Sequence, residues 1–492
     1  MPFALSCRYH IARGGLMKHL ILFSCLAVMF ITTGCATNPV TGRRQLAIIS
    51  EASEIETGRA AFPQYTQAFQ GEFQDDTLQG YVTTVGKKLA ANSHRPNLEY
   101  EFRVVNTSDV NAFALPGGKI MITRALLEKF DNEAQMAGVL GHEVGHVAAM
   151  HYISDASQQL LINLVIAAGA IYMEHKGYKY ADYATLGAYV GAMMYLAHYS
   201  REQERQADQL GVEYMTKNGY DPRAYVSVME LFLKLQEGEP SIVERLFATH
   251  PLTTERIATC TTQATSMLAQ YNTNPAAPLR LAQAEYGGAT RRLMAVAPAY
   301  ALMDEGDKLQ EDGNYNAAIA KYTEGIRQAP DQPLIYLSRA QAYMEQDELG
   351  QAGRDIAAAR KYYPDLFYTR YFAGIHSFKS RSWQRSLTEF NAAEKLLAGV
   401  TDVQFYLGRC EEELGHRSAA AEHFTKFLED EPEGDNVTYC KTRLRDWGYT
   451  VPGEAAAPAG STTNSNRSNT TNSSGNSQRR EDDDYWRNRV GH

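Results

Sequence analysis

The sequence lacks several patterns that would each define a class of protein. Its 492 residues include six cysteines but no CxxC pair, which excludes a zinc ribbon and a thioredoxin-type redox motif. The formal net charge of -9 at pH 7 gives no reason to expect nucleic acid as a partner. Two apolar runs, residues 20–31 and 160–173, are too short to cross a bilayer at full thickness. The length and an apolar content of 44% nevertheless predict two or more domains with sizeable cores.

The first apolar run predicts an export signal. It follows a short basic start at Met17, which is itself an alternative first residue of the protein. The run ends in ITTGCATNP, which resembles a bacterial lipobox with Cys35 as the lipidated residue. Thr32 departs from that pattern, and cleavage at an ordinary small-x-small site is the alternative. We therefore expect residues 1–35 to be a signal peptide with a lipobox. The mature protein would lie in the periplasm, anchored by lipid to the outer membrane because Ala36 rather than Asp follows.

Export also permits disulfide bonds. Besides Cys35, the mature chain keeps Cys260, Cys410 and Cys440. Three is an odd number, so at least one of these thiols would stay unpaired. The sequence leaves open whether the other two pair.

The C-terminal half carries a repeat of 34 residues. Small residues recur at this spacing, and so do larger apolar ones: Gly306, Ala340, Gly374 and Gly408, and then Tyr322, Ile356, Phe390 and Phe424. Small residues where two helices cross, at this period, are typical of tetratricopeptide repeats. We predict four helix pairs over residues 298–433 and a capping helix over 435–450. Such arrays bind peptides or partner proteins on a concave surface, although this one could serve stability alone.

The remaining segments complete the expected domain organisation. Residues 36–271 are mostly helical by pattern, with a small β-hairpin predicted at NAFALPGGKIMIT. Residues 272–297 are rich in Ala and Pro and are the expected linker to the repeat domain, residues 298–450. Residues 451–492 are small and polar and should be disordered. The second apolar run is expected to be a buried helix, with a membrane-dipping segment as the alternative. The predicted fold class is mainly α, with an α-solenoid after the first domain.

The stretch VLGHEVGHVAAMH places two histidines four residues apart. His142 and His146 would lie one turn apart on one side of a helix that begins at Asn132. Both imidazoles can then reach one zinc ion at about 2.0–2.1 Å. Glu143 can reach a water on that ion without being a ligand itself. This division of roles is what the H-E-x-x-H motif provides. The competing interpretation is a polar, solvated helix face.

A catalytic zinc ion needs a third protein ligand. His151 follows His146 by five residues, with Ala149 where the metzincin pattern has a glycine turn, so this histidine does not fit that role. His151 is expected to lie behind the site or at the surface.

The stretch YSREQERQADQLG holds the better candidate. Glu204 and Asp208 lie four apart on one helix face. Glu204 could ligate zinc, and Asp208 could accept the free ring N–H of a zinc histidine. Glu202 competes as a ligand but points away from Asp208. The stretch on its own would equally suit a solvated, charged helix.

Together these stretches resemble a known family. HEVGH, then EQERQAD, after NAFALPGGKIMITRALL and before ATHPLTTERI, is similar to the gluzincin zinc metallopeptidase family of HtpX and BepA. The likeness spans about residues 38–257. The lipobox, NPVTGRRQLAIIS and the repeats are similar to its periplasmic lipoprotein proteases in particular. The resemblance implies one zinc ion per chain, held by His142, His146 and Glu204.

The resemblance also implies roles for residues that local patterns leave ambiguous. It places Asp208 behind a zinc histidine, and it brings His250 and Arg256 of FATHPLTTERI to the active site. There both could stabilise an oxyanion, or His250 could occupy the open zinc position as a plug. From the residues alone, His250 only ends one helix before the next begins.

The implied function is zinc-dependent hydrolysis of peptide bonds. Glu143 would act as general base, and residues 112–115 could pair with substrate as an added strand. By resemblance, the substrates and partners are unfolded, misfolded or stalled outer-membrane proteins. The repeats would recruit them or the outer-membrane assembly machinery. The alternative function is a non-proteolytic chaperone or assembly factor that works through the repeats.

Overall fold

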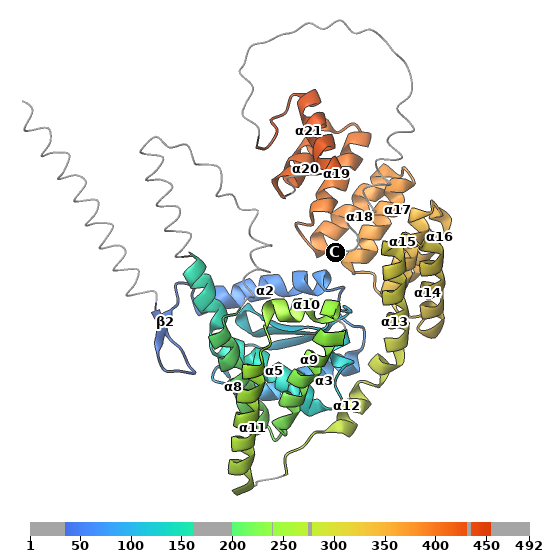
Figure 1. Cartoon of the computed structure of the whole chain (residues 1–492). Coiled ribbons are helices and arrows are strands. Elements are labelled where there is room, and N and C mark those ends of the chain that lie inside the picture. The colour runs from blue at the N-terminus through green and yellow to red at the C-terminus, as the bar shows by residue number, and fades with distance from the viewer. Residues whose placement is uncertain (1–34, 161–198, 239, 274–277, 431–433, 454–492) are drawn as a thin grey trace, which may run out of the picture.

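The computed structural model describes residues 35–160, 199–238, 240–273, 278–430 and 434–453 (Figure 1). It confirms a mainly helical chain with a small β component and a solenoid of repeats. The signal peptide, most of the second apolar run and nearly all of the polar tail lie outside these residues. No helix within the described ranges has the length and apolar character needed to cross a membrane.

The central sheet has three strands in the order β3-β5-β4. β3 (Glu101–Val105) runs parallel to β5 (Lys119–Thr123), and β4 (Ala112–Leu115) runs antiparallel to β5. The predicted hairpin is therefore confirmed. Its turn is the short 3-10 segment η1 (Pro116–Gly118), in which Gly117 has a φ of 67°. A Cβ on this residue would lie 2.7 Å from the Cα of Ile55. β4 lies at the edge of the sheet.

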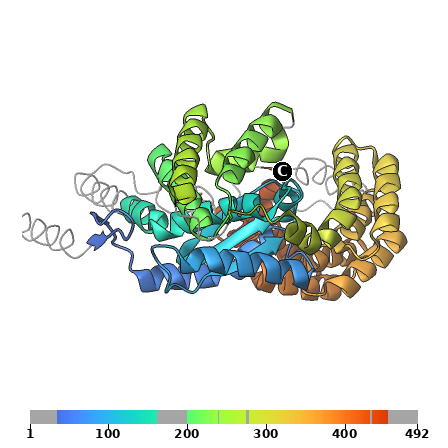
Figure 2. The same ribbon diagram turned by 90° about the horizontal axis from the view of Figure 1, so that it is seen from below.

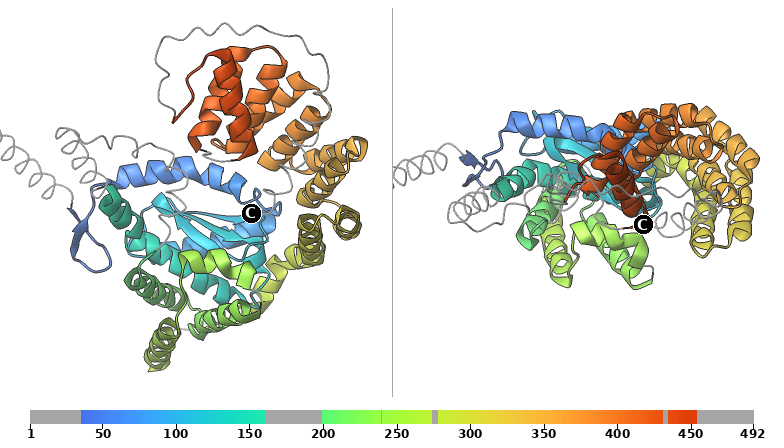
Figure 3. Two further views of the ribbon diagram at one scale, coloured as in Figure 1. Left: turned by 45° about the horizontal axis from the view of Figure 1, so that its top comes forward. Right: turned by 90° about the horizontal axis from the view of Figure 1, so that it is seen from above.

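Alternation along the strands gives the sheet two buried faces. One face contributes Val105, Phe113 and Met121 to a cluster with α2 (Glu51–Ala68). The other face contributes Val104 and Ile122 to the main core, where α3 (Asp76–Ala91) and α5 (Glu133–Ala148) pack. Figure 3 shows the strands between α2 and the helices of the main core.

Helix α5 carries the H-E-x-x-H motif through the middle of this core, and all of its residues are buried. It begins as predicted, because the Asn132 side chain accepts a hydrogen bond from the Gln135 backbone N–H. The Gln135 side chain accepts from Asp131 N instead of closing a capping box on Asn132. The acceptor contact of Gln135 is thus one residue earlier than in a capping box, but the helix still begins where the sequence predicts.

Glycines allow α5 to approach α8 (Arg201–Lys217) closely. A Cβ on Gly141 would lie 3.1 Å from Gly211 O, and one on Gly145 would lie 3.1 Å from Ala207 O. A Cβ on Gly211 would lie 2.9 Å from the backbone N of His142. The helices therefore meet almost backbone to backbone, and this contact brings the side chains of the two motifs together.

The described part of the N-terminal domain, which we define as residues 35–273, also contains the short helix α4 (Arg124–Leu127) after β5. It further contains an N-terminal hairpin and three longer helices. The helices are α9 (Arg223–Gly238), α10 (Pro240–Thr249) and α11 (Thr254–Thr273). The hairpin joins β1 (Cys35–Thr37) to β2 (Arg44–Leu46). Asn38 Nδ2 donates to Ala149 O at 2.9 Å, so the hairpin satisfies a carbonyl at the end of α5.

The stretch predicted as a linker, residues 272–297, is largely helical where the structure describes it. α12 (Gln283–Ala289) lies within it, and α13 (Arg291–Glu311) begins seven residues before the expected boundary at 298. Tyr286 is buried and its hydroxyl donates to Leu127 O. The alanines favour helix here, and Pro298 is accommodated inside α13 instead of opening it.

The predicted repeat array is confirmed as four helix pairs and a capping helix. Its helices stack side by side in a curve (Figure 2). They are α13 with α14 (Tyr315–Gln328), α15 (Pro333–Glu345) with α16 (Leu349–Tyr362), α17 (Phe367–Lys379) with α18 (Trp383–Leu396), α19 (Thr401–Glu413) with α20 (Arg417–Asp430), and the capping helix α21 (Asp435–Trp447).

The 34-residue period has a direct steric cause. A Cβ added at Gly306, Gly374 or Gly408 would lie 2.4–2.8 Å from an aromatic ring sixteen residues later in the chain. Each small residue therefore makes room for the large residue of the partner helix, which explains why both positions repeat together. These rings are Tyr322, Phe390 and Phe424.

The array contacts the N-terminal domain at two places. Near its start, Tyr300 OH accepts from Asn106 Nδ2 at 2.8 Å, and the Arg124 guanidinium lies 3.7 Å from the Tyr300 ring centroid. Further along, Phe367 N donates to Gln67 Oε1 at 2.7 Å. The sequence left open whether two of the cysteines pair. In the described residues Cys260, Cys410 and Cys440 are buried and form no disulfide.

Candidate metal centre

Four buried side chains direct ligand atoms at one point between α5, α8 and the end of α10. The Nε2 atoms of His142 and His146 are 3.0 Å apart, and His146 Nε2 lies 3.3 Å from Glu204 Oε1. His250 Nδ1 lies 3.4 Å from His142 Nε2 and 3.0 Å from Glu204 Oε1. All four donors fall within 4.8 Å of one another. Ligands about 2.0–2.1 Å from a tetrahedral ion are roughly 3.3 Å apart, so the set fits one zinc ion.

The charges of these groups favour a bound cation. Burial alone would raise the pKa of Glu204, but the rings of His250, His146 and His142 lower it well below its usual range. Burial lowers the pKa of His146 well below its usual value, so this ring is neutral, as a ligand must be. Burial opposes the charge on His250, yet Glu204 and Glu143 raise its pKa to about 9. The two carboxylates therefore attract positive charge to this point.

Glu143 lies beside the four donors without joining them. Its side chain is buried and its Oε1 is 3.8 Å from His250 Nε2. Within the described part of the chain, its Oε2 has no hydrogen-bond partner. Burial raises the pKa of this carboxyl, while the nearby rings of His250 and His142 and a hydrogen bond from the Ala114 backbone on edge strand β4 oppose the rise. Glu143 therefore has the position and the basicity of a proton acceptor.

A charged network supports His142 from behind. Asp208 Oδ1 is 3.0 Å from His142 Nδ1, and the Tyr225 hydroxyl is 3.0 Å from the same nitrogen. Tyr225 donates to Asp208 Oδ1 at 2.8 Å. Burial would raise the pKa of Asp208, but Arg256 and His142 lower it to about 2, so this carboxylate stays charged.

Arg256 lies where the sequence prediction put it, near the site, but it binds carboxylates. Its Nε and Nη2 donate to the two oxygens of Asp208 at 2.8 Å each, and its Nη1 is 2.8 Å from Glu204 Oε2. The guanidinium therefore links Glu204, a candidate metal ligand, to Asp208, which supports His142. Nothing in the sequence pattern singled out Tyr225, because no motif surrounds it.

A neutral pair supports His146. Its Nδ1 lies 2.9 Å from His151 Nδ1, and His151 Nε2 lies 2.9 Å from Gln206 Oε1. The Tyr199 ring stacks on His146 with centroids 3.8 Å apart. As expected, His151 is not among the metal donors.

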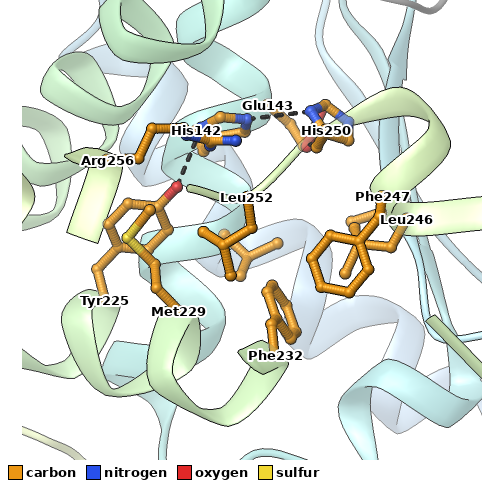
Figure 4. A pocket seen from close by; sticks show the side chains of 12 residues that line it. His142, Glu143, Tyr225, Met229, Phe232, Leu246, Phe247, His250, Leu252 and Arg256 are labelled. Atoms are coloured by element: carbon orange, nitrogen blue, oxygen red, sulfur yellow. Dashed lines mark hydrogen bonds and ion pairs between the residues drawn. The ribbon is translucent and has the colours of Figure 1, made fainter. Parts of the chain in front are cut away.

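An apolar pocket opens beside His142 and Glu143 (Figure 4). Its walls come mainly from α9 and from the end of α10, and the segment that carries His250 also contributes. The apolar lining residues include Val139, Met229, Phe232, Leu246, Phe247 and Leu252.

Two histidines one turn apart, a glutamate ligand from a second helix and a free glutamate beside them define the class of gluzincin-type zinc metallopeptidases. Residues 76–264 match the model of peptidase family M48. This part of the chain is similar to that family, whose members use zinc, and the donors here fit one ion. Residues 306–347 match a model of the TPR repeat.

Curated relatives agree with this assignment. The beta-barrel assembly-enhancing protease of Escherichia coli (strain K12) is 26% identical over 237 residues, which cover 47% of this chain and 48% of that protein. The protein of the same name from Yersinia pestis is 30% identical over 39% of this chain and 40% of its own length. Mitochondrial metalloendopeptidase OMA1 of Arabidopsis thaliana is 33% identical over 36% of this chain and 34% of its own. The chain thus spans about half the length, or less, of these relatives.

Proposed function

We propose that this protein is an exported zinc-dependent endopeptidase that hydrolyses peptide bonds in misfolded or stalled outer-membrane proteins. The observation that carries the proposal is the buried set of His142, His146 and Glu204 with Glu143 beside it. The names of the bacterial relatives support the outer-membrane role, since they describe proteases that enhance β-barrel assembly.

The residues divide the reaction among them. Bound zinc supplies a Lewis acid for the scissile carbonyl and the attacking water. Glu143 takes a proton from that water, and then donates it to the leaving amine as the peptide bond breaks. Edge strand β4 aligns the substrate backbone by adding it to the sheet, which makes recognition tolerant of sequence.

His250 acts as a gate in this proposal. Its Nδ1 is within 3.4 Å of His142 Nε2 and within 3.0 Å of Glu204 Oε1, the place of a fourth ligand. A ring held there blocks the position that the attacking water needs. The competing role is stabilisation of the oxyanion, together with Arg256, although the bonds of Arg256 to Asp208 and Glu204 favour the gate.

The membrane anchor and the repeats give the proposed enzyme its place and its partners. Cys35, at the start of β1, would carry lipid and hold the protein at the outer membrane, facing the periplasm. Mass spectrometry of the mature protein should find a lipidated Cys35, and Cys35→Ser should move the protein to the soluble periplasmic fraction. The repeat array would bind substrates or the outer-membrane assembly machinery.

The substitution Glu143→Gln tests the proposed activity. It should keep the zinc content of the wild type and lose casein cleavage, because an amide cannot accept the proton. Casein cleavage at the wild-type rate would refute the assignment. The alternative, a chaperone that works through the repeats, predicts that Glu143→Gln restores envelope function in a deletion strain as well as the wild type does.

A further inference from the structure

The pair behind His146 differs from the supports usual for zinc histidines, which are carboxylates, backbone carbonyls or water. Here the nearest partner of His146 Nδ1 is another ring nitrogen, His151 Nδ1, at 2.9 Å. Both histidines are almost completely buried, with 1% and 3% of their surfaces exposed. The second nitrogen of His151 meets the side-chain oxygen of Gln206 at 2.9 Å.

Counting protons gives this chain one consistent arrangement when zinc is bound. A zinc ion on His146 Nε2 requires the ring proton on Nδ1. His151 Nδ1 must then accept, so the proton of a neutral His151 lies on Nε2. That N–H donates to Gln206 Oε1, which can only accept. Each nitrogen and oxygen in the row then has a partner of the right kind.

We infer that His151 is the positioning residue of His146: it fixes the tautomer and the ring angle of this zinc ligand, and Gln206 fixes His151 in turn. The inference rests on zinc at this site, which belongs to the proposed function, but not on proteolysis. It assigns a use to a histidine that the H-E-x-x-H motif does not include.

The backbone around His151 is held in a way that suits this role. Met150 has a φ of 57°, a conformation that non-glycine residues rarely adopt. Asn38 Nδ2 donates to Ala149 O at 2.9 Å and Gln45 Nε2 donates to Met150 O at 3.5 Å, so the N-terminal hairpin holds this turn. This turn follows the end of α5, and the His151 ring that comes after it lies beside His146 with ring centroids 5.0 Å apart.

Rotation of the His146 ring is limited from another side as well. Tyr199 stacks on it at 3.8 Å with an interplanar angle of 23°, whereas His151 meets it edge to face at 73°. Stacking fixes the plane of the ring but not which nitrogen carries the proton. The bond to His151 is the contact that selects the tautomer.

Three substitutions separate this role from simple filling of the core. His151→Phe keeps an aromatic ring of similar size and removes the acceptor. His151→Gln keeps an acceptor oxygen. Gln206→Leu leaves the His151 N–H without its acceptor and changes a side chain that is only partly buried. Gln209→Leu, at an exposed position on the same helix, is the matched control.

The readouts are zinc affinity from competition with a chelator, the absorption spectrum of the Co²⁺-substituted protein, and the melting temperature of the metal-free protein. We expect His151→Phe to weaken zinc binding about 10–100-fold and to change the Co²⁺ spectrum, as loss of such supports does. His151→Gln should restore most of the affinity. Gln206→Leu should give a smaller loss, and Gln209→Leu none.

Two results would overturn the inference. One is zinc affinity in both His151→Phe and Gln206→Leu equal to that of the control. The other is an equal loss of affinity in His151→Phe and His151→Gln, accompanied by an equal fall in the metal-free melting temperature, because that pattern belongs to a residue that only fills space. If the wild type binds zinc but cleaves no protein, the proposed function fails while the inference stands.

Discussion

The two histidines of the H-E-x-x-H motif lie one turn apart on the same helix, yet their supports are of opposite character. His142 meets a charged network of Asp208, Tyr225 and Arg256, in which the carboxylate stays ionised. His146 meets the neutral row of His151 and Gln206. Hydrogen bonds to an ionised group are roughly twice as strong as neutral ones. The first support therefore holds its ligand more firmly.

The difference also reflects what else is buried nearby. Glu143, Glu204 and Asp208 already bury three carboxyl groups at the site, and Arg256 pairs with the last two. A fourth carboxylate behind His146 would add another negative charge to the same core, and a buried charge is costly unless it is paired. A neutral imidazole and an amide orient the ring without adding charge.

Removing the charged support should have the largest effect. Asp208→Asn leaves the Arg256 guanidinium with a single carboxylate and takes the ionised acceptor from His142. Breaking a buried pair of this kind costs about 3–5 kcal/mol of folding stability, and zinc affinity should fall by about 100-fold. Chemical denaturation and chelator competition measure these two quantities. Glu202→Gln, an exposed change on the same helix, is the control. A loss for Asp208→Asn no larger than for His151→Phe would refute the ranking of the two supports.

His250, the proposed gate, has its Nδ1 3.4 Å from His142 Nε2. Its removal should change the rate of cleavage and not the three proposed zinc ligands. His250→Ala should retain zinc and raise basal casein cleavage, because the fourth position becomes accessible. If His250 instead stabilises the oxyanion, cleavage should fall by roughly 10²–10³-fold. A rate equal to the wild type would exclude both roles.

Acid should remove the stabilisation that the charge on Asp208 provides. Asp208 has a pKa of about 2 in the folded protein, below its usual value of 3.8. Because the folded pKa is depressed, this carboxylate stabilises the fold above its usual pKa, and the contribution of roughly 2 kcal/mol disappears as the pH falls from about 4 to 2. Metal-free wild type should therefore lose more stability over this interval than metal-free Asp208→Asn. Parallel curves for the two proteins would contradict the assignment.

A smaller change within the same support is Tyr225→Phe. It removes one hydroxyl that bonds both His142 and Asp208, while Asp208 keeps its contacts to Arg256 and His142. The expected loss is about 1 kcal/mol of stability, with a few-fold weaker zinc binding. Thermal melting with and without zinc would measure it. A loss as large as that of Asp208→Asn would show that the hydroxyl, and not the carboxylate, holds His142.

The sequence predicts those parts of the site in which the residues are close together along the chain. His142 and His146 on one helix, and Glu204 and Asp208 on another, follow from steps of four residues. The supports do not, because they come from helix packing. Tyr225 reaches the site since Gly138, one turn before His142, leaves room for its ring, where a Cβ would come within 2.8 Å.

The same distinction applies to the fold. The repeat array was predictable because three of its four units repeat the same close contact between a glycine and an aromatic ring, as at Gly408 and Phe424. The helical structure of the stretch predicted as a linker could not be predicted. An Ala- and Pro-rich sequence has no pattern that distinguishes an extended connection from a helix packed against the domain. The burial of Tyr286 and Leu293, which decides the matter, depends on partners elsewhere in the chain.

We propose that one zinc ion, held between α5 and α8, makes this protein an endopeptidase. The most direct test is to strip the wild type with a chelator, return zinc in measured steps, and follow bound zinc and casein cleavage in the same samples. Both should be lost on stripping and should return together, reaching a plateau at one zinc ion per chain. Cleavage that survives complete removal of the metal, or zinc that returns fully without restoring cleavage, would contradict the claim.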